Sequence, residues 1–343
     1  MNHQQRVSTF IRLGQLLGEI AANPLESSWS SAIQKAEAEN KWFTLENVTL
    51  ALSGISTMLE PEKLTKWTRN YAGKIPKTGD KRVAIIMAGN IPLVGFHDLL
   101  CVLISGNQAI VKTSSQDKAL VNKLVETIGE IDPVLASQIQ LTEGKMEHFT
   151  HVIATGSDNS ARYFEYYFGK YPNIIRKNRN SIAIIDGDES LDDLRALGKD
   201  IFRYFGLGCR NVSKVYLSDK MDPKTFLATL EDWKAIANHN KYFNNYEYHK
   251  AIFLVERMAH LDNGFLLLKE DPNLGCPVGV LHFQTYGTLD QMKAEIKIHE
   301  DKIQCVVASD KLEITGTVPF GKAQSPELWD YADGVDTMAF LLS

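Results

Sequence analysis

The sequence predicts an α/β protein with two Rossmann-like α/β domains and a helical N-terminal region. From Lys81 onward, short apolar runs alternate with amphipathic stretches of helix length, which is typical of parallel strands joined by crossover helices. Before that point, residues 1–75 show only helical periodicity. The chain has 343 residues, of which 44% are hydrophobic, so it is long enough for two domains and carries enough apolar surface for their cores.

The N-terminal region is predicted to form amphipathic helices separated by turn signals at Asn23-Pro24 and Glu60-Pro61. These helices are expected near residues 7–21, 29–38, 45–59 and 62–71. The first lacks the basic segment, uninterrupted apolar stretch and small-residue cleavage site of a secretory signal, so we expect no such signal.

The first α/β series follows this region. Its predicted strands read VAIIM, QAIVK and HVIAT, and its helices are expected in PLVGFHDLLCVLISG, KALVNKLVETIGEI and SARYFEYYFGK. Pro92 is predicted to start the first of these helices. Residues 83–111 carry one formal charge, Asp98, but polar and glycine residues interrupt them. We therefore expect buried sheet core there and no membrane span.

A second α/β series is predicted from Ser181. Its expected elements are a strand at SIAIIDG, a helix over 191–204, a strand at KVYLS, a helix over 223–236 and strands near GFLLL, VGVLHF and IQCVVA. The two series predict three parts of the chain, namely a first domain over 1–177, a second domain over 178–315 and a tail over 316–343 that packs back on the body.

Charge, cysteine content and missing motifs exclude several classes of protein. Thirty-seven Lys and Arg against 42 Asp and Glu leave a net charge of -5, so no general basic field favours nucleic acid. The four cysteines lack CxxC spacing, which argues against a disulfide framework or zinc site and fits a cytoplasmic setting. No GxGxxG, P-loop, HExxH or GxSxG motif is present, which argues against nucleotide triphosphatases, metalloproteases and serine hydrolases.

Cys209 is the first candidate catalytic residue. It lies in GLGCR, where the glycines allow a ligand to approach the backbone and Arg203 and Arg210 would favour a thiolate. The alternative is an ordinary buried cysteine that packs as a small hydrophobe. Two other cysteines fall in predicted helix or strand core, so Cys276, in the turn NLGCPVG, is the only rival nucleophile.

Polar residues follow three predicted strands of the first series. Asn90 comes just after the first strand, where a side-chain amide can donate to an oxyanion or simply cap a turn. Lys112 ends the second strand and precedes a run of hydroxyls that includes Ser115, a pattern that suits a ribose or its phosphate as well as a capped helix. Gly156 and Ser157 end the third strand and open a helix whose N–H groups suit a pyrophosphate.

The order of these residues resembles the aldehyde dehydrogenase superfamily. Lys112 follows Asn90 by 22 residues and Cys209 follows Gly156 by 53, both close to that family's pattern. Within the superfamily the chain looks most like the LuxC-related fatty-acyl-CoA reductases, an impression supported by WFTLENVTLAL and by FGKAQSPELWDYADGVDTM near the C-terminus. The resemblance implies an aldehyde-dehydrogenase-like fold, with a cofactor-binding first domain and a second domain that carries the catalytic cysteine.

The resemblance also implies a reaction. The Cys209 thiolate would attack an acyl-CoA, with the oxyanion held by the Asn90 amide and the Cys209 N–H, and NADPH or NADH would reduce the acyl-enzyme to an aldehyde. Lys112 would bind the adenosine ribose, and Gly156 with Ser157 the pyrophosphate. Ser115 stands where NAD-preferring relatives often place a glutamate, which favours NADPH.

One departure from the family pattern distinguishes reduction from oxidation. Arg176 stands where ordinary aldehyde dehydrogenases carry the glutamate that activates water, so hydrolysis of the thioester loses its base. Whether Glu270, His239 or His249 supplies a second acid or base is left open.

Aldehyde oxidation, acyl phosphate reduction and a non-catalytic nucleotide-binding subunit remain alternative functions. A homo-oligomer, and a partner enzyme that supplies activated acyl groups, are further expectations of the resemblance.

Overall fold

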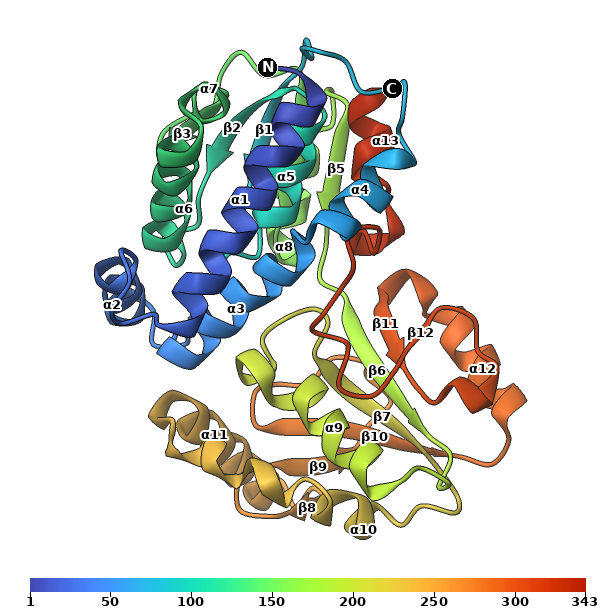
Figure 1. Cartoon of the computed structure of the whole chain (residues 1–343). Coiled ribbons are helices and arrows are strands. Elements are labelled where there is room, and N and C mark those ends of the chain that lie inside the picture. The colour runs from blue at the N-terminus through green and yellow to red at the C-terminus, as the bar shows by residue number, and fades with distance from the viewer. The chain divides into compact units, whose positions relative to one another are not determined.

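The computed structural model describes residues 1–343. The chain divides into two compact units, which are Met1–Asn178 together with Pro326–Ser343, and Arg179–Ser325 (Figure 1). We call them unit 1 and unit 2. Each unit is built on one mainly parallel sheet, five-stranded in unit 1 and seven-stranded in unit 2. The predicted α/β class with a helical N-terminal region is therefore confirmed.

Helices form the N-terminal part of unit 1, close to the predicted ranges. They are α1 (His3–Ala22), α2 (Ser30–Glu39), α3 (Leu45–Met58) and α4 (Pro61–Arg69). Asn2 begins α1 with a capping box that includes Gln5, and Pro61 starts α4, where its missing N–H costs nothing. A Cβ at Gly14 of α1 would lie 2.6 Å from the Cβ of Leu59, so this glycine allows the close approach of α1 to the end of α3.

The sheet of unit 1 is parallel throughout, with strand order β3-β2-β1-β4-β5. Its strands are β1 (Arg82–Ile86), β2 (Gln108–Lys112), β3 (Ile139–Thr142), β4 (His151–Thr155) and β5 (Asn173–Arg176), and its helices are α5 (Phe96–Ile104), α6 (Lys118–Ile131), α7 (Pro133–Ala136) and α8 (Asp158–Phe168). Parallel strands share one carboxyl edge, so the loops after β2, β1 and β4 are neighbours.

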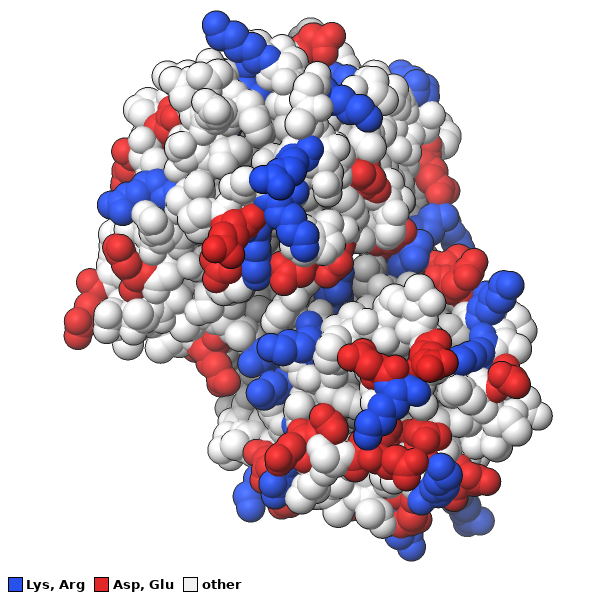
Figure 2. Space-filling view, turned by 45° about the vertical axis from the view of Figure 1, so that its right-hand side comes forward, with Lys and Arg blue, Asp and Glu red and all other residues white.

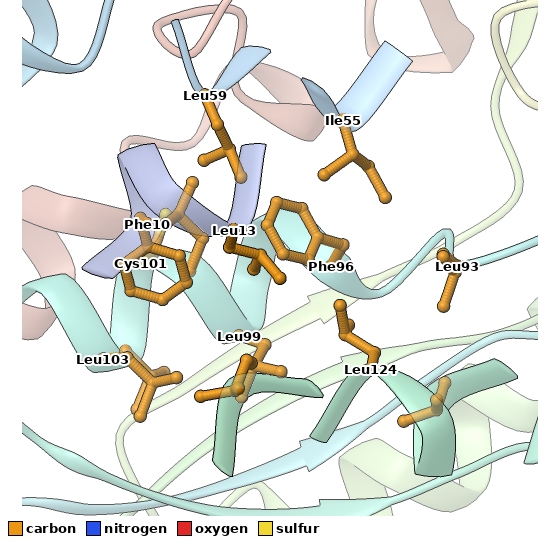
Figure 3. Packing of buried hydrophobic residues seen from close by; sticks show 14 of the residues in the cluster. Phe10, Leu13, Ile55, Leu59, Leu93, Phe96, Leu99, Cys101, Leu103 and Leu124 are labelled. Atoms are coloured by element: carbon orange, nitrogen blue, oxygen red, sulfur yellow. The ribbon is translucent and has the colours of Figure 1, made fainter. Parts of the chain in front are cut away.

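The stretch 83–111 forms β1, α5 and β2, largely buried, as predicted. No helix of the chain has the length and apolar character needed to cross a membrane. Figure 3 shows part of the apolar core of unit 1, with the labelled side chains Phe10, Leu13, Ile55, Leu59, Leu93, Phe96, Leu99, Cys101, Leu103 and Leu124. Helices α1, α3, α5 and α6 thus pack together through this core.

One predicted helix start in unit 1 is wrong. Pro92 lies in a turn, and α5 begins four residues later at Phe96, with Gly95 as its N-cap. Leu93 has a φ of 55°, a left-handed conformation that a right-handed helix cannot include, so α5 begins only after it. The extra turn lengthens the loop that carries Asn90.

The sheet of unit 2 has the order β12-β11-β6-β7-β10-β9-β8, with only the β8–β9 pair antiparallel. Its strands are β6 (Asn180–Ile185), β7 (Val212–Ser218), β8 (Leu261–Asp262), β9 (Leu267–Glu270), β10 (Val280–Tyr286), β11 (Ile303–Val307) and β12 (Thr317–Val318), and its α-helices are α9 (Leu191–Phe202), α10 (Pro223–Ala228), α11 (Asn240–Val255) and α12 (Leu289–Ile298). The helix predicted over 223–236 is divided, because α10 ends at Ala228 and a 3-10 helix spans Glu231–Asn238.

The C-terminal segment Pro326–Ser343 packs within unit 1, whereas the residues just before it belong to unit 2. Its helix α13 (Thr337–Leu342) contacts α5. The hydroxyl of Tyr331 in this segment accepts a 2.7 Å hydrogen bond from the indole N–H of Trp67 in α4.

On the face shown in Figure 2, acidic and basic side chains are interspersed over each unit.

Candidate active site

Cys209 lies in unit 2, in the loop between α9 and β7, and it is exposed. The other cysteines are less accessible, since Cys101 and Cys305 are buried and Cys276 is partly buried. Burial raises the pKa of the Cys276 thiol to about 12, and this thiol donates to the carbonyl of Val280 at 2.9 Å. Burial also raises the pKa values of the Cys101 and Cys305 thiols. Among the cysteines, Cys209 is therefore the most accessible to solvent.

The chain leading to Cys209 takes an unusual path. Tyr204, Phe205 and Gly206 have φ values of 53°, 58° and 76°, so three consecutive residues adopt the left-handed conformation. This conformation costs a non-glycine residue about 1–2 kcal/mol, so the surrounding structure must hold the loop. Before these residues, Arg203 is already non-helical with φ −54° and ψ 143°, so α9 ends at Phe202 and the predicted helix over 191–204 is too long.

Two buried side chains fix the backbone around Cys209. The Asn211 amide binds backbone groups before Cys209, accepting from the N–H of Gly208 at 2.8 Å. The Ser181 hydroxyl of β6 donates to the carbonyl of Cys209 at 2.9 Å. Sequence reasoning missed both residues. Asn211 stands two positions after the cysteine, and an asparagine in a glycine-rich turn is the only sequence signal for it.

In unit 1 the structure brings Asn90 and the predicted cofactor residues to one edge of the sheet. Asn90 follows β1, Lys112 ends β2, and Gly156 with Ser157 follows β4, and these three strands are adjacent. Asn90, Ser115 and Ser157 are exposed, whereas Lys112 is half-buried. Cys209 belongs to unit 2, so its pairing with Asn90 stays a prediction.

Local contacts hold the predicted cofactor residues at this edge. The ammonium group of Lys112 donates to the carbonyl of Gly144 at 3.3 Å and lies at the end of β2. Ser157 caps α8, accepting from the N–H of Ser160 at 3.3 Å. A Cβ at Gly156 would lie 2.8 Å from that of Ser160, so close packing of strand and helix requires glycine here. Asp158, in the first turn of α8, adds a negative charge to the same helix end.

A buried carboxylate supports the loop that carries Asn90. Asp117, just before α6, accepts a hydrogen bond from the N–H of Leu93 at 2.8 Å through Oδ2, while its Oδ1 is buried without a hydrogen-bond partner. Burial raises the pKa of Asp117 well above its ordinary value. Sequence reasoning missed this residue, although an acidic residue before an apolar periodic run is an N-cap signal.

Arg176 is locked in a buried ion pair. Its guanidinium binds the carboxylate of Asp98 in α5 and donates to the hydroxyl of Thr337 in α13 at 3.1 Å. Burial alone would lower the pKa of Arg176, but the Asp98 carboxylate raises it above its ordinary value. Arg176 therefore stays charged and cannot serve as a base.

The residues considered for a second acid or base lie apart from one another. Glu270 is exposed at the end of β9. His249 lies within α11, and burial lowers its pKa. His239 caps α11 through its Nδ1, and its ring stacks on Phe205 of the Cys209 loop with centroids 4.2 Å apart. His239 therefore contacts the loop that carries the cysteine.

The chain is similar to known acyl reductases. The family model for acyl-CoA reductase (LuxC) matches residues 28–244. The chain is 23% identical over 223 residues to a long-chain acyl-protein thioester reductase of Photorhabdus laumondii, and 27% identical over 216 residues to one of Aliivibrio fischeri. These matches cover 59% and 57% of this chain but only 46% and 44% of the relatives. The matched part thus spans less than half the length of either relative.

Solved structures show the fold. A benzaldehyde dehydrogenase from Corynebacterium glutamicum matches 90% of this chain and 76% of its own at a TM-score of 0.67 and 12% identity. A lactaldehyde dehydrogenase from Escherichia coli matches 91% of this chain and 76% of its own at a TM-score of 0.64 and 15% identity. The aldehyde-dehydrogenase-like fold implied by the sequence resemblance is confirmed. With its family model matched over more than half of its residues, the chain belongs to the acyl-CoA reductase (LuxC) family.

Proposed function

We propose that this chain reduces an acyl thioester to an aldehyde through a covalent acyl-cysteine formed on Cys209. The observation that carries the proposal is the contrast among the cysteines of a LuxC-family chain. Cys209 is exposed on a loop with a fixed backbone, whereas the others are partly or fully buried. An exposed thiol on a rigid turn suits nucleophilic attack, because little rearrangement is needed to reach the transition state.

The chemistry follows from the nucleophile. The Cys209 thiolate attacks the thioester carbonyl carbon, a new carbon–sulfur bond forms, and the oxygen becomes an oxyanion. The oxyanion collapses, the bond to the leaving thiol breaks, and Cys209 holds the acyl group. The backbone N–H of Cys209 and the side-chain amide of Asn90 are the proposed oxyanion donors. When bound, a nicotinamide cofactor would supply the hydride that reduces the acyl group, and the Cys209 thiolate would be regenerated as the aldehyde leaves.

Reduction is favoured over hydrolysis because a general base is missing. Arg176 occupies the family position of the glutamate that activates water, and its ion pair with Asp98 keeps it charged and buried. Without a carboxylate to remove a proton from water, the acyl-enzyme survives until hydride transfer. The missing base is equally compatible with an acyl phosphate as the acyl donor. The test must therefore identify the leaving group.

The cofactor is proposed to bind at the carboxyl edge of the unit 1 sheet. Lys112 would contact the adenosine ribose, and the N-terminus of α8 at Gly156 and Ser157 would contact the pyrophosphate. We propose NADPH in preference to NADH, because Ser115, three residues after Lys112, carries no charge that would repel a ribose phosphate. Self-association, and delivery of acyl groups by a partner enzyme, belong to the same proposal.

A turnover assay tests the proposal. The full chain is mixed with NADPH or NADH and with acyl-CoA esters of graded length, an acyl carrier protein thioester or acetyl phosphate. Cofactor oxidation and thiol release are followed together. Oxidised cofactor and released thiol in equal amounts, with both signals absent in Cys209→Ala, support thioester reduction. The donor that gives these signals is the substrate class. Cofactor oxidation with acetyl phosphate alone, or no Cys209-dependent turnover with any donor, would refute it.

A further inference from the structure

The carboxamide of Asn211 binds several backbone groups at once. Asn211 is buried, with 3% of the residue exposed. Nδ2 donates to the carbonyls of Asp200, Ile201 and Arg203 at 3.0, 3.3 and 2.9 Å. The first two carbonyls lie at the end of α9 and the third lies just beyond it. Oδ1 accepts from the N–H of Gly208 at 2.8 Å. One amide thus joins the end of a helix to the residue before Cys209.

The backbone of Asn211 adds a second constraint. Its N–H donates to the carbonyl of Gly208 at 3.0 Å, closing a tight turn around Cys209. The Gly208 carbonyl and the Cys209 N–H belong to the same planar trans peptide, so fixing the carbonyl also fixes the direction of that N–H. Asn211 therefore holds both peptide units that flank Gly208.

The other side of the cysteine is held independently. Ser181 donates to the Cys209 carbonyl at 2.9 Å and accepts from the N–H of Cys305 at 3.2 Å, so its hydroxyl bridges the loop to β11. The strained residues before the turn cannot by themselves maintain its shape, because the left-handed conformation is unfavourable for Tyr204 and Phe205. The Asn211 amide is the side chain that binds on both sides of this strained stretch.

We propose that Asn211 is a positioning residue for the nucleophile. By tying the Cys209 turn to the end of α9, its amide orients the Cys209 N–H so that it can donate to the developing oxyanion. The inference rests on the proposed function, in which that N–H is an oxyanion donor. It assigns Asn211 a role in forming the acyl-enzyme that goes beyond packing and does not require contact with the substrate.

Two probes separate orientation of the N–H from access to the thiol. Transfer of an acetyl group from 4-nitrophenyl acetate to Cys209 passes through an oxyanion, whereas alkylation by iodoacetamide does not. In the full-length Asn211→Ala variant, the Cys209-dependent burst of 4-nitrophenolate is expected to slow by about ten- to a hundred-fold. This is less than the roughly 100- to 1,000-fold loss on removing an oxyanion donor outright, because the Cys209 N–H is misdirected but still present. Alkylation stays near the wild-type rate. With acyl-CoA, kcat falls while KM changes little.

Further variants refine the comparison. Asn211→Asp has nearly the same size and keeps an acceptor for the N–H of Gly208. It lacks the amide donors and faces the carbonyls of α9 with a negative charge. This variant should therefore slow the burst at least as much as Asn211→Ala. Asn211→Ser retains one donor and serves if the alanine variant does not fold. Asp222→Ala removes the N-cap of α10 in the same unit and is the matched control, expected to lower Tm without changing either rate.

The outcomes are distinct. A wild-type burst rate in the Asn211 variants, or an equal slowing of burst and alkylation, overturns the positioning role. A Cys209-dependent burst in the wild-type protein without turnover of any thioester overturns the proposed function, while the Asn211 comparison still applies. Absence of any Cys209-dependent burst in the wild-type protein overturns both.

Discussion

The backbone N–H of Leu93 donates a 2.8 Å hydrogen bond to the buried carboxylate of Asp117. This bond joins the loop after β1, which carries Asn90, to the start of α6. It also stabilises Leu93 in a left-handed conformation that is unfavourable by itself. The second carboxylate oxygen of Asp117 is buried without a partner, so the support of this loop depends on an acceptor whose charge is poorly solvated.

The first prediction concerns the pH dependence of stability at Asp117. Its pKa is raised by burial in the folded state, so the folded protein keeps this proton at pH values where the unfolded chain has lost it. Below the ordinary carboxyl pKa, Asp117 is protonated in both states and its ionisation does not lower the free energy of unfolding. As pH rises above that pKa, ionisation favours the unfolded chain and the free energy of unfolding falls. Asp117→Asn keeps an acceptor for Leu93 and cannot ionise. Its free energy of unfolding relative to wild type should therefore increase from pH 4 to pH 8, as measured by urea unfolding. A difference that stays constant with pH would contradict the raised pKa.

The second prediction concerns the ion pair between Arg176 and Asp98. Removing one partner leaves a buried charge, so Arg176→Met should lower the free energy of unfolding by about 3–5 kcal/mol. The double variant Arg176→Met/Asp98→Leu removes both charges and should recover most of that loss. Urea unfolding of the two single variants and the double variant measures the coupling. Additive losses would show that the pair is not coupled.

The third prediction concerns cofactor affinity at the N-terminus of α8. Asp158 places a negative charge beside the proposed pyrophosphate site, so Asp158→Asn should tighten nicotinamide dinucleotide binding by about two- to five-fold at low salt, with a smaller gain at high salt. Glu165→Gln, which makes the same charge change farther along α8, is the matched control and should have little effect. Affinity is measured by fluorescence titration. An equal gain in both variants would show that only net charge matters.

The fourth prediction concerns thiol reactivity. Iodoacetamide at pH 7.5 should label Cys209 first, because it is exposed, whereas Cys276 is partly buried and has a pKa of about 12. Mass spectrometry of digested protein, sampled over time, gives the order of labelling. In Cys209→Ala the fast phase should disappear. Labelling of Cys276 at the same rate as Cys209 would revive it as the rival nucleophile.

Much of the fold could be predicted from the sequence, because periodicity is a local property. The apolar run that ends at Lys112 forms β2 as expected, and the helix predicted after Gly156 and Ser157 begins at Asp158. The local predictions failed where a backbone conformation is imposed by distant contacts. Leu93 delays α5, and the chain leaves α9 at Arg203, just before the left-handed residues Tyr204 and Phe205.

The sequence by itself determined the α/β class, the alternation of strands and helices and the residue types at the ends of the strands of unit 1, because hydrophobic periodicity and turn residues encode these features locally. Only the tertiary structure decided which polar groups are buried together. Arg176 meets Asp98 across 78 residues, and Asn211 binds carbonyls at the end of α9. Such pairings depend on how distant elements pack, since a buried donor or acceptor must find whatever partner the completed core places beside it.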